Sequence, residues 1–105
     1  MKPINISVDL QANAVYVRYR NPVGIIEQLD VARDANGAVR WFTVGEDEDH
    51  DPHVVVDVDG TGEVVGVEIL GFDAETMRLA HDLCTARGLS APADLGGAIA
   101  ALRAA

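Results

Sequence analysis

The chain has 105 residues, a formal net charge of -9, and 49% hydrophobic but only 5% aromatic residues. This length favours a single domain, residues 1–105, with an aliphatic core. No apolar run reaches the roughly 18 residues of a membrane span, and the first residues do not resemble a signal peptide. The one cysteine excludes an internal disulfide framework. We therefore expect a cytoplasmic protein that binds neither membranes nor nucleic acids, whose phosphates an acidic surface repels.

Apolar and polar residues alternate along much of the first 70 positions, which is typical of half-buried strands. The predicted strands span residues 4–10, 14–20, 23–31, 38–44, 54–58 and 64–70. The first two are expected to form a hairpin, with Ile4, Ile6, Val8 and Leu10 on the buried face of the first strand.

Asn36-Gly37 predicts a second hairpin, because both residues tolerate the positive φ of a tight two-residue turn. With these two at the centre of the turn, Val31 faces Phe42. Trp41 then points outward, where it covers a second apolar surface or marks a contact site.

Asp73 is a suitable N-cap for a helix over residues 74–87, and Gly88 is a suitable stop. A second helix is predicted from Ser90 or Ala91 onward, because Leu95, Ile99 and Leu102 recur at helical spacing. The predicted fold class is α+β: an antiparallel sheet of about six strands in residues 1–70, followed by two C-terminal helices in residues 71–105 that pack on one face.

Residues 57–68 fit the spacing of a calcium-binding EF-hand loop, with Asp57, Asp59 and Glu68 at ligand positions. However, valine-rich segments flank the loop, and they favour strands over the helices that an EF-hand needs. In a hairpin, Glu68 lies more than about 10 Å from the turn, given ~3.3 Å per residue. We therefore interpret this stretch as a plain hairpin.

Two segments carry a family resemblance. Asp9 to Arg18, with its Val-Tyr-Val run, and Val56 to Leu70, with its V-G-V-E-I-L strand, resemble the opening and closing signatures of the YuzE-like domains of unknown function. The resemblance covers residues 4–70 and implies a small bacterial domain on an antiparallel sheet, without an established activity, cofactor or catalytic residue. The segment between Arg33 and His53 is longer than in a usual member.

In the predicted register of the last hairpin, His53 lies opposite Glu68, and His50 is three residues away in an acidic loop. Imidazole and carboxylate ligands suit zinc or another divalent metal. The simpler interpretation is a cross-strand His–Glu pair. His81 and Cys84 share one helix face and could form a nucleophile pair, but Cys84 falls on the apolar stripe, where a cysteine is usually inert.

Apolar residues also occur in outward positions, above all Tyr16 and Trp41, which are therefore candidate interface residues. A face that the helices do not cover can take another copy of the chain, and a homodimer is the commonest solution. The leading hypothesis is a non-enzymatic binding or structural module that self-associates and has no cofactor. The alternative is a metal-binding protein or small metal-dependent enzyme that uses His50, His53 and Glu68.

Overall fold

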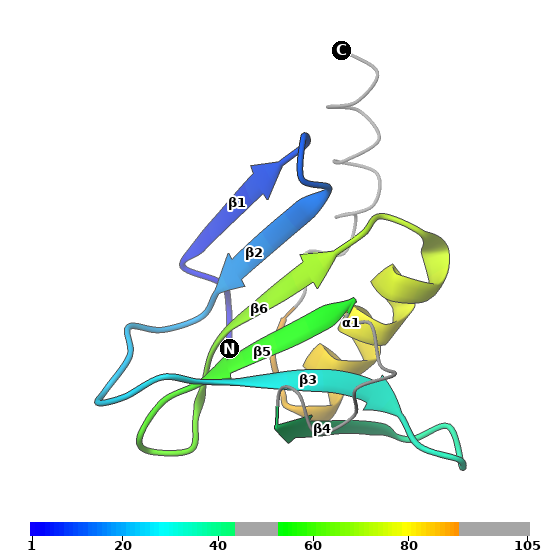
Figure 1. Ribbon diagram of the computed structural model, residues 1–105. Helices are drawn as coiled ribbons and strands as arrows, with labels where there is room; N and C mark the ends of the chain where they lie inside the picture. The colour runs from blue at the N-terminus through cyan, green and yellow to red at the C-terminus, as the bar shows by residue number, and fades with distance from the viewer. Residues whose placement is uncertain (44–52, 91–105) are drawn as a thin grey trace.

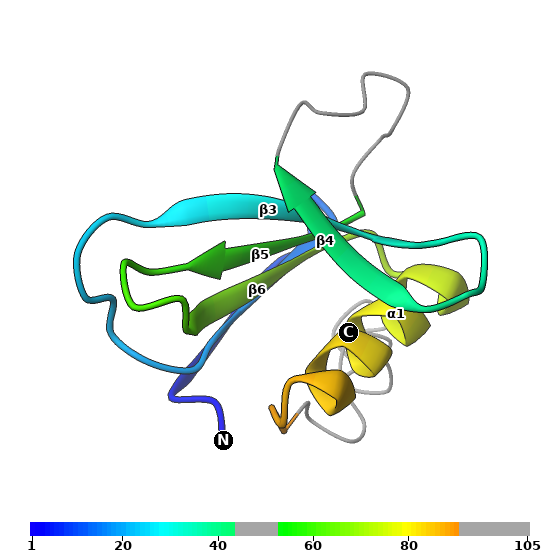
Figure 2. The same cartoon turned by 90° about the horizontal axis from the view of Figure 1, so that it is seen from below.

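The computed structural model describes residues 1–43 and 53–90. One six-stranded sheet, antiparallel throughout, carries a helix on one face (Figures 1 and 2). The elements are β1 (Asn5–Asp9), β2 (Ala14–Arg18), β3 (Glu27–Arg33), β4 (Val39–Thr43), β5 (Val54–Val58), β6 (Val64–Leu70) and α1 (Ala74–Ala86). The α+β class and the antiparallel sheet are thus confirmed. One helix is described, and the predicted second helix lies outside the described residues.

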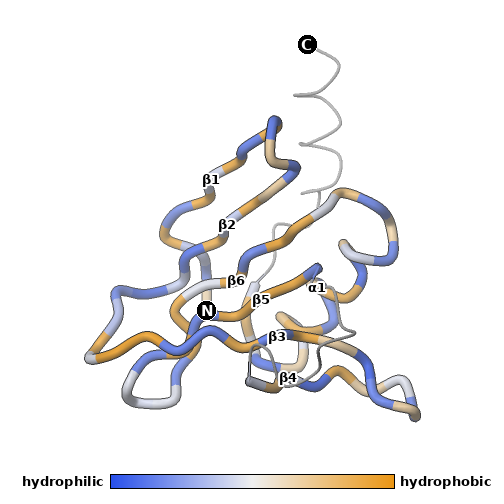
Figure 3. The backbone as a smooth tube through the Cα atoms, viewed as in Figure 1, coloured by the Kyte–Doolittle hydropathy of each residue, from blue (hydrophilic) through white to orange (hydrophobic). Residues whose placement is uncertain are grey.

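The sheet has the strand order β1-β2-β6-β5-β3-β4, so the β5–β6 hairpin lies at its centre. These two strands match their predicted bounds and are rich in valine, which suits strands buried on both faces (Figure 3). The β1–β2 hairpin adds to β6, and the β3–β4 hairpin adds to β5. Hairpins that are local in sequence therefore assemble into one continuous sheet.

Helix α1 begins where Asp73 accepts a hydrogen bond from the Thr76 N–H, as predicted. It ends before Gly88, whose φ of 69° is unfavourable for residues with a Cβ. Its buried side chains pack on one face of the sheet and close the core. That core comprises Val15, Val17, Tyr19, Val31, Val54, Val56, Val58, Val64, Val67, Ile69, Ala80, Leu83 and Cys84.

The β3–β4 hairpin forms as predicted, but its register differs by one residue. Val31 faces Trp41, not Phe42. The reason is the turn: Gly37 adopts φ 81° and donates to the Asp34 carbonyl, while the Asp34 N–H donates to the Ala38 carbonyl. This is a three-residue loop rather than a two-residue one. The predicted outward position of Trp41 is therefore wrong, and its side chain packs against the core.

The β5–β6 hairpin is also confirmed, with a corrected register. Val56 pairs with Val67, and the ladder is irregular at Asp57 and Val58. Gly62 takes φ 81°, and the wider turn from Asp59 to Glu63 shifts β6 by two residues from the predicted pairing. The turn has no EF-hand geometry, because strands flank it on both sides.

Asp59 connects the loop after β2 to the β5–β6 turn through hydrogen bonds. Its buried carboxylate accepts hydrogen bonds from the Thr61 N–H and hydroxyl and from the Val23 N–H, and it lies 3.6 Å from the Arg20 guanidinium. The Gly60 N–H donates in return to the Val23 carbonyl. Strand β3 therefore begins at Glu27 and not at Val23 as predicted, because these hydrogen bonds hold Val23 in the loop.

The hydrogen bond from Thr61, with those from backbone N–H groups, lowers the pKa of Asp59 to about 2. An unfolded Asp has a pKa of about 3.9, so this carboxylate stabilises the fold fully above pH ~4 and loses its effect as the pH falls toward 2. We expect Asp59→Asn to lower Tm at pH 6 and the difference from the wild type to shrink at pH 2. Calorimetry at both values measures this.

Glu63→Gln is the matched control, because Glu63 is an exposed carboxylate in the same turn. It is expected to leave Tm nearly unchanged at both pH values. A Tm deficit of Asp59→Asn that stays constant between pH 6 and pH 2 would contradict the ionic contribution of Asp59.

No helix within residues 1–43 and 53–90 is long and apolar enough to cross a membrane.

Candidate functional site

Strand β1 lies at one edge of the sheet, and among the described strands it pairs with β2 alone. All five of its residues are exposed. The predicted apolar face exists, but it is not half-buried: Ile4 is 57%, Ile6 40%, Val8 36% and Leu10 38% exposed. The sequence pattern thus predicted the apolar face correctly, but the prediction that this face is buried is wrong. Among the described elements, α1 packs mainly against β3, β4, β5 and β6, so it does not cover β1.

The edge of β1 lacks the features that usually keep a sheet edge from pairing. The strand Asn-Ile-Ser-Val-Asp contains no proline, lysine or arginine, and its pairing with β2 is regular over all five positions. Its one charge, Asp9, is at the end and accepts hydrogen bonds from the Gln11 and Ala12 N–H groups. The rest of the edge is neutral in a strongly acidic chain.

The opposite edge, β4, is better protected. Arg40 forms an ion pair with Asp34 at 3.1 Å, and the Arg87 guanidinium lies 3.4 Å from the centre of the Trp41 ring. A charged side chain and a covering cation both disfavour the addition of another strand. The two edges of the sheet are therefore not equivalent, and β1 is the open one.

The predicted pairing of His53 with Glu68 is wrong. The shifted register places His53 at the level of Leu70, whose N–H donates to the His53 carbonyl, and places Glu68 opposite Val55. His53 instead lines a cavity of about 250 Å3 beside Asp73 at the start of α1. Hydrogen bonds from Thr76, and in smaller part the nearby His53, lower the pKa of Asp73.

Two of the three residues of the predicted metal site lie in the described part of the chain. His50 lies outside the described residues, and Glu68 lies opposite Val55, two positions along the strand from His53. Within the described parts of the chain, no three His, Cys, Asp or Glu side chains are grouped so that they could hold a metal ion.

Tyr16 lies on the sheet face opposite α1. Its hydroxyl donates to the Asp57 carboxylate at 2.9 Å, and its ring passes over Gly66, where a Cβ would be 2.2 Å from the hydroxyl oxygen. Burial, with the hydrogen bond to Asp57, raises the pKa of Tyr16 to about 12. Tyr16 is half-buried, and its side chain extends from β2 across β6 to β5. It therefore contributes little area to a contact surface.

A row of residues in register crosses this face: Tyr16, Glu68, Val55, Asp30 and Phe42. Asp30 is buried, and in the described part of the chain its Oδ1 has no hydrogen-bond partner. Such an oxygen is costly to bury. This face therefore mixes acidic and apolar side chains, unlike the uncharged apolar face of β1.

The cysteine is not part of a nucleophile pair. Cys84 is buried and lies 3.4 Å from the Tyr19 hydroxyl, whereas His81 is exposed on the helix. Burial raises the pKa of the Cys84 thiol, which keeps it in the unreactive protonated form at neutral pH.

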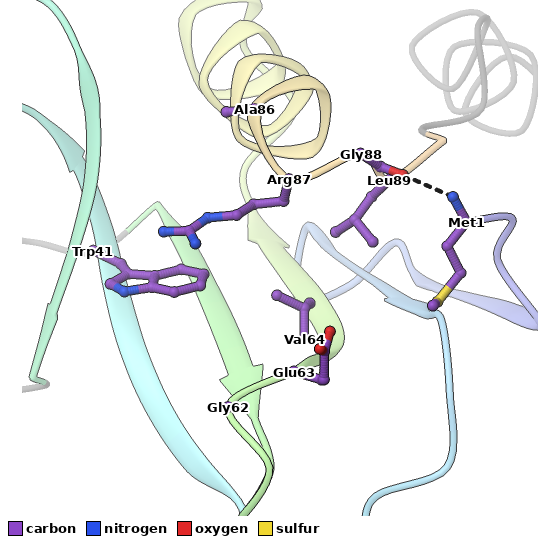
Figure 4. A pocket seen from close by; sticks show the side chains of 9 residues that line it. All are labelled: Met1, Trp41, Gly62, Glu63, Val64, Ala86, Arg87, Gly88 and Leu89. Atoms are coloured by element: carbon purple, nitrogen blue, oxygen red, sulfur yellow. Dashed lines mark hydrogen bonds between the residues drawn. The ribbon is translucent and has the colours of Figure 1, made fainter.

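A larger cavity of about 450 Å3 lies between the end of α1, β4 and the β5–β6 turn (Figure 4). Trp41 and Arg87 form one side and Glu63 another. Sequence reasoning singled out Trp41 but not Arg87, because the two residues are far apart in the chain and meet only through the packing of α1 beside β4.

Comparison with known proteins found no matching family model, curated protein or solved structure. The resemblance of residues 4–70 to YuzE-like domains stays a prediction.

Proposed function

We propose that this chain is a non-enzymatic binding module that associates with a second copy of itself through β1. The observation that carries the proposal is an edge strand that pairs on one side only, among the described strands, and has an exposed apolar face. Exposed strands of this kind are templates for pairing with another chain. A second strand satisfies the free backbone groups and covers the apolar side chains in one step.

The sequence of β1 is self-complementary. Antiparallel pairing centred on Ser7 brings Ile6 beside Val8 of the second copy, and Asn5 beside Asp9 of the second copy. No two like charges then face each other across the new ladder, which would destabilise it. The resulting interface has twofold symmetry, as in most homodimers, and it joins two six-stranded sheets into one.

The net charge of -9 supports the choice of this strand. Two copies repel each other over most of their surface, so they approach best where charge is lowest. β1 carries one charged residue, and that carboxylate is already engaged by its own turn. Association is therefore expected to strengthen as added salt screens the remaining repulsion.

Ile6→Lys tests this proposal. We expect the wild type to sediment as a species of twice the 11.2 kDa chain mass at micromolar concentration, and the variant to sediment as a monomer. A lysine at Ile6 places a charge in the apolar contact, which is expected to raise the dissociation constant by about tenfold or more. Analytical ultracentrifugation measures both.

Ile25→Lys is the matched control. Ile25 is 86% exposed, in the loop between β2 and β3, and lies outside the proposed contact. This variant makes the same chemical change and is expected to leave the dimer intact. Dissociation by Ile25→Lys but not by Ile6→Lys would place the contact on that loop, and a monomeric wild type would end the proposal.

A further inference from the structure

The cavity at the end of α1 has the size of a small-molecule site. Its volume of about 450 Å3 falls within the roughly 300–1,000 Å3 of typical ligand pockets. Its wall combines apolar groups, Trp41, Val64 and Leu89, with two opposite charges, Arg87 and Glu63 (Figure 4). Polar and charged groups beside apolar ones can orient a ligand in such a site.

Trp41 holds the Arg87 guanidinium in place. The guanidinium carbon lies 3.4 Å from the ring centre, so the cation stacks on the indole face. Figure 4 shows Arg87 extending from the end of α1 across the ring, on the side of the cavity away from Met1 and Leu89. Stacking uses the face of the guanidinium and leaves its N–H donors, which lie in its plane, available to a ligand.

Arg87 has no carboxylate partner in the described part of the chain. Three other arginines form ion pairs: Arg20 with Asp59, Arg33 with Asp82 and Arg40 with Asp34. Among residues 1–43 and 53–90, the side-chain contact that Arg87 makes is the stacking on Trp41. A pre-positioned guanidinium with free donors binds a carboxylate through two parallel hydrogen bonds.

We propose that this cavity binds a small monocarboxylate with an apolar body, with Arg87 as the bidentate donor and Trp41 as its support. The apolar wall of Val64 and Leu89 takes the hydrocarbon part of the ligand. Glu63 disfavours a second negative charge in the cavity, so a phosphate or a dicarboxylate binds less well than a monocarboxylate.

The test compares benzoate with benzamidine, which has nearly the same shape and the opposite charge. Trp41 is the only tryptophan, so its indole N–H gives a single signal in a nitrogen–proton correlation spectrum of the full chain. We expect benzoate to shift this signal saturably, phosphate to shift it only at higher concentration, and benzamidine to leave it in place. A saturable shift with benzamidine alone would assign the cavity to Glu63 and cations, and no saturable shift with benzoate would overturn the proposal.

Two substitutions assign the binding to Arg87. Arg87→Met keeps the length of the side chain but removes the donors, and it is expected to raise the Kd for benzoate by about tenfold or more. Arg78→Met makes the same change at an exposed position of α1 outside the cavity and is expected to leave the Kd unchanged. Glu63→Gln is expected to lower the Kd. Equal affinities for the wild type and Arg87→Met would show that Arg87 is not the anion-binding group.

Discussion

Leu83→Ala is expected to lower the free energy of unfolding by about 2–5 kcal/mol. Leu83 is 2% exposed and is among the largest fully buried side chains. It lies on the face of α1 that closes the core over the sheet. Removal of its isobutyl group leaves a cavity between helix and sheet, which the surrounding valines fill poorly because β-branched side chains have few alternative rotamers.

A loss of this size is a large part of the 5–15 kcal/mol that stabilises a typical domain. Tm should fall by roughly 10 °C or more, and urea denaturation measures the free energy itself. Leu79→Ala is the control, because Leu79 is on the same helix and only partly buried. Equal losses for the two variants would show that α1 does not close the core through Leu83.

Gly66→Ala is expected to destabilise the protein by about 1–3 kcal/mol, a typical cost of overpacking. The added methyl group occupies the position of the Tyr16 ring, so the ring must move and its hydrogen bond to Asp57 is lost. An aromatic ring that covers a strand glycine from the neighbouring strand stabilises the sheet at a position that is otherwise weak. Urea denaturation of both proteins measures the loss.

A double-mutant cycle isolates the contact between ring and glycine. In a Tyr16→Ala background the space above Gly66 is empty, and alanine loses less backbone entropy than glycine on folding. Gly66→Ala should then be neutral or slightly stabilising. The same destabilisation in both backgrounds would place the strain in the backbone of β6 and not in the Tyr16 ring.

Local patterns predicted the elements well. The bounds of β5 and β6 and the Asp73 cap follow from valine content, alternation and a capping side chain within a few residues of one another. The registers of the β3–β4 and β5–β6 hairpins could not be predicted from these local patterns, because they depend on the φ angles that Gly37 and Gly62 adopt in their turns. A glycine permits several turn lengths, and each length gives a different set of cross-strand partners.

The candidate sites depended on these registers. An error of two residues in the β5–β6 pairing placed His53 beside Glu68, and an error of one residue turned Trp41 outward. The exposure of Ile6 and the stacking of Arg87 on Trp41 depend on where α1 lies across the sheet. Sequence periodicity shows which face of an element is apolar, but not whether another element reaches it.

The strand order also fixes when the sheet can assemble during synthesis. The central hairpin, β5–β6, is made after both hairpins that flank it. A ribosome that has released residues 1–43 has produced two hairpins with no common neighbour, and isolated two-stranded hairpins are at best marginally stable. The two halves of the sheet therefore stay separate until β6 is released and pairs with β2 on one side and β5 on the other. The apolar face of β3 and β4 then stays uncovered until α1 is made.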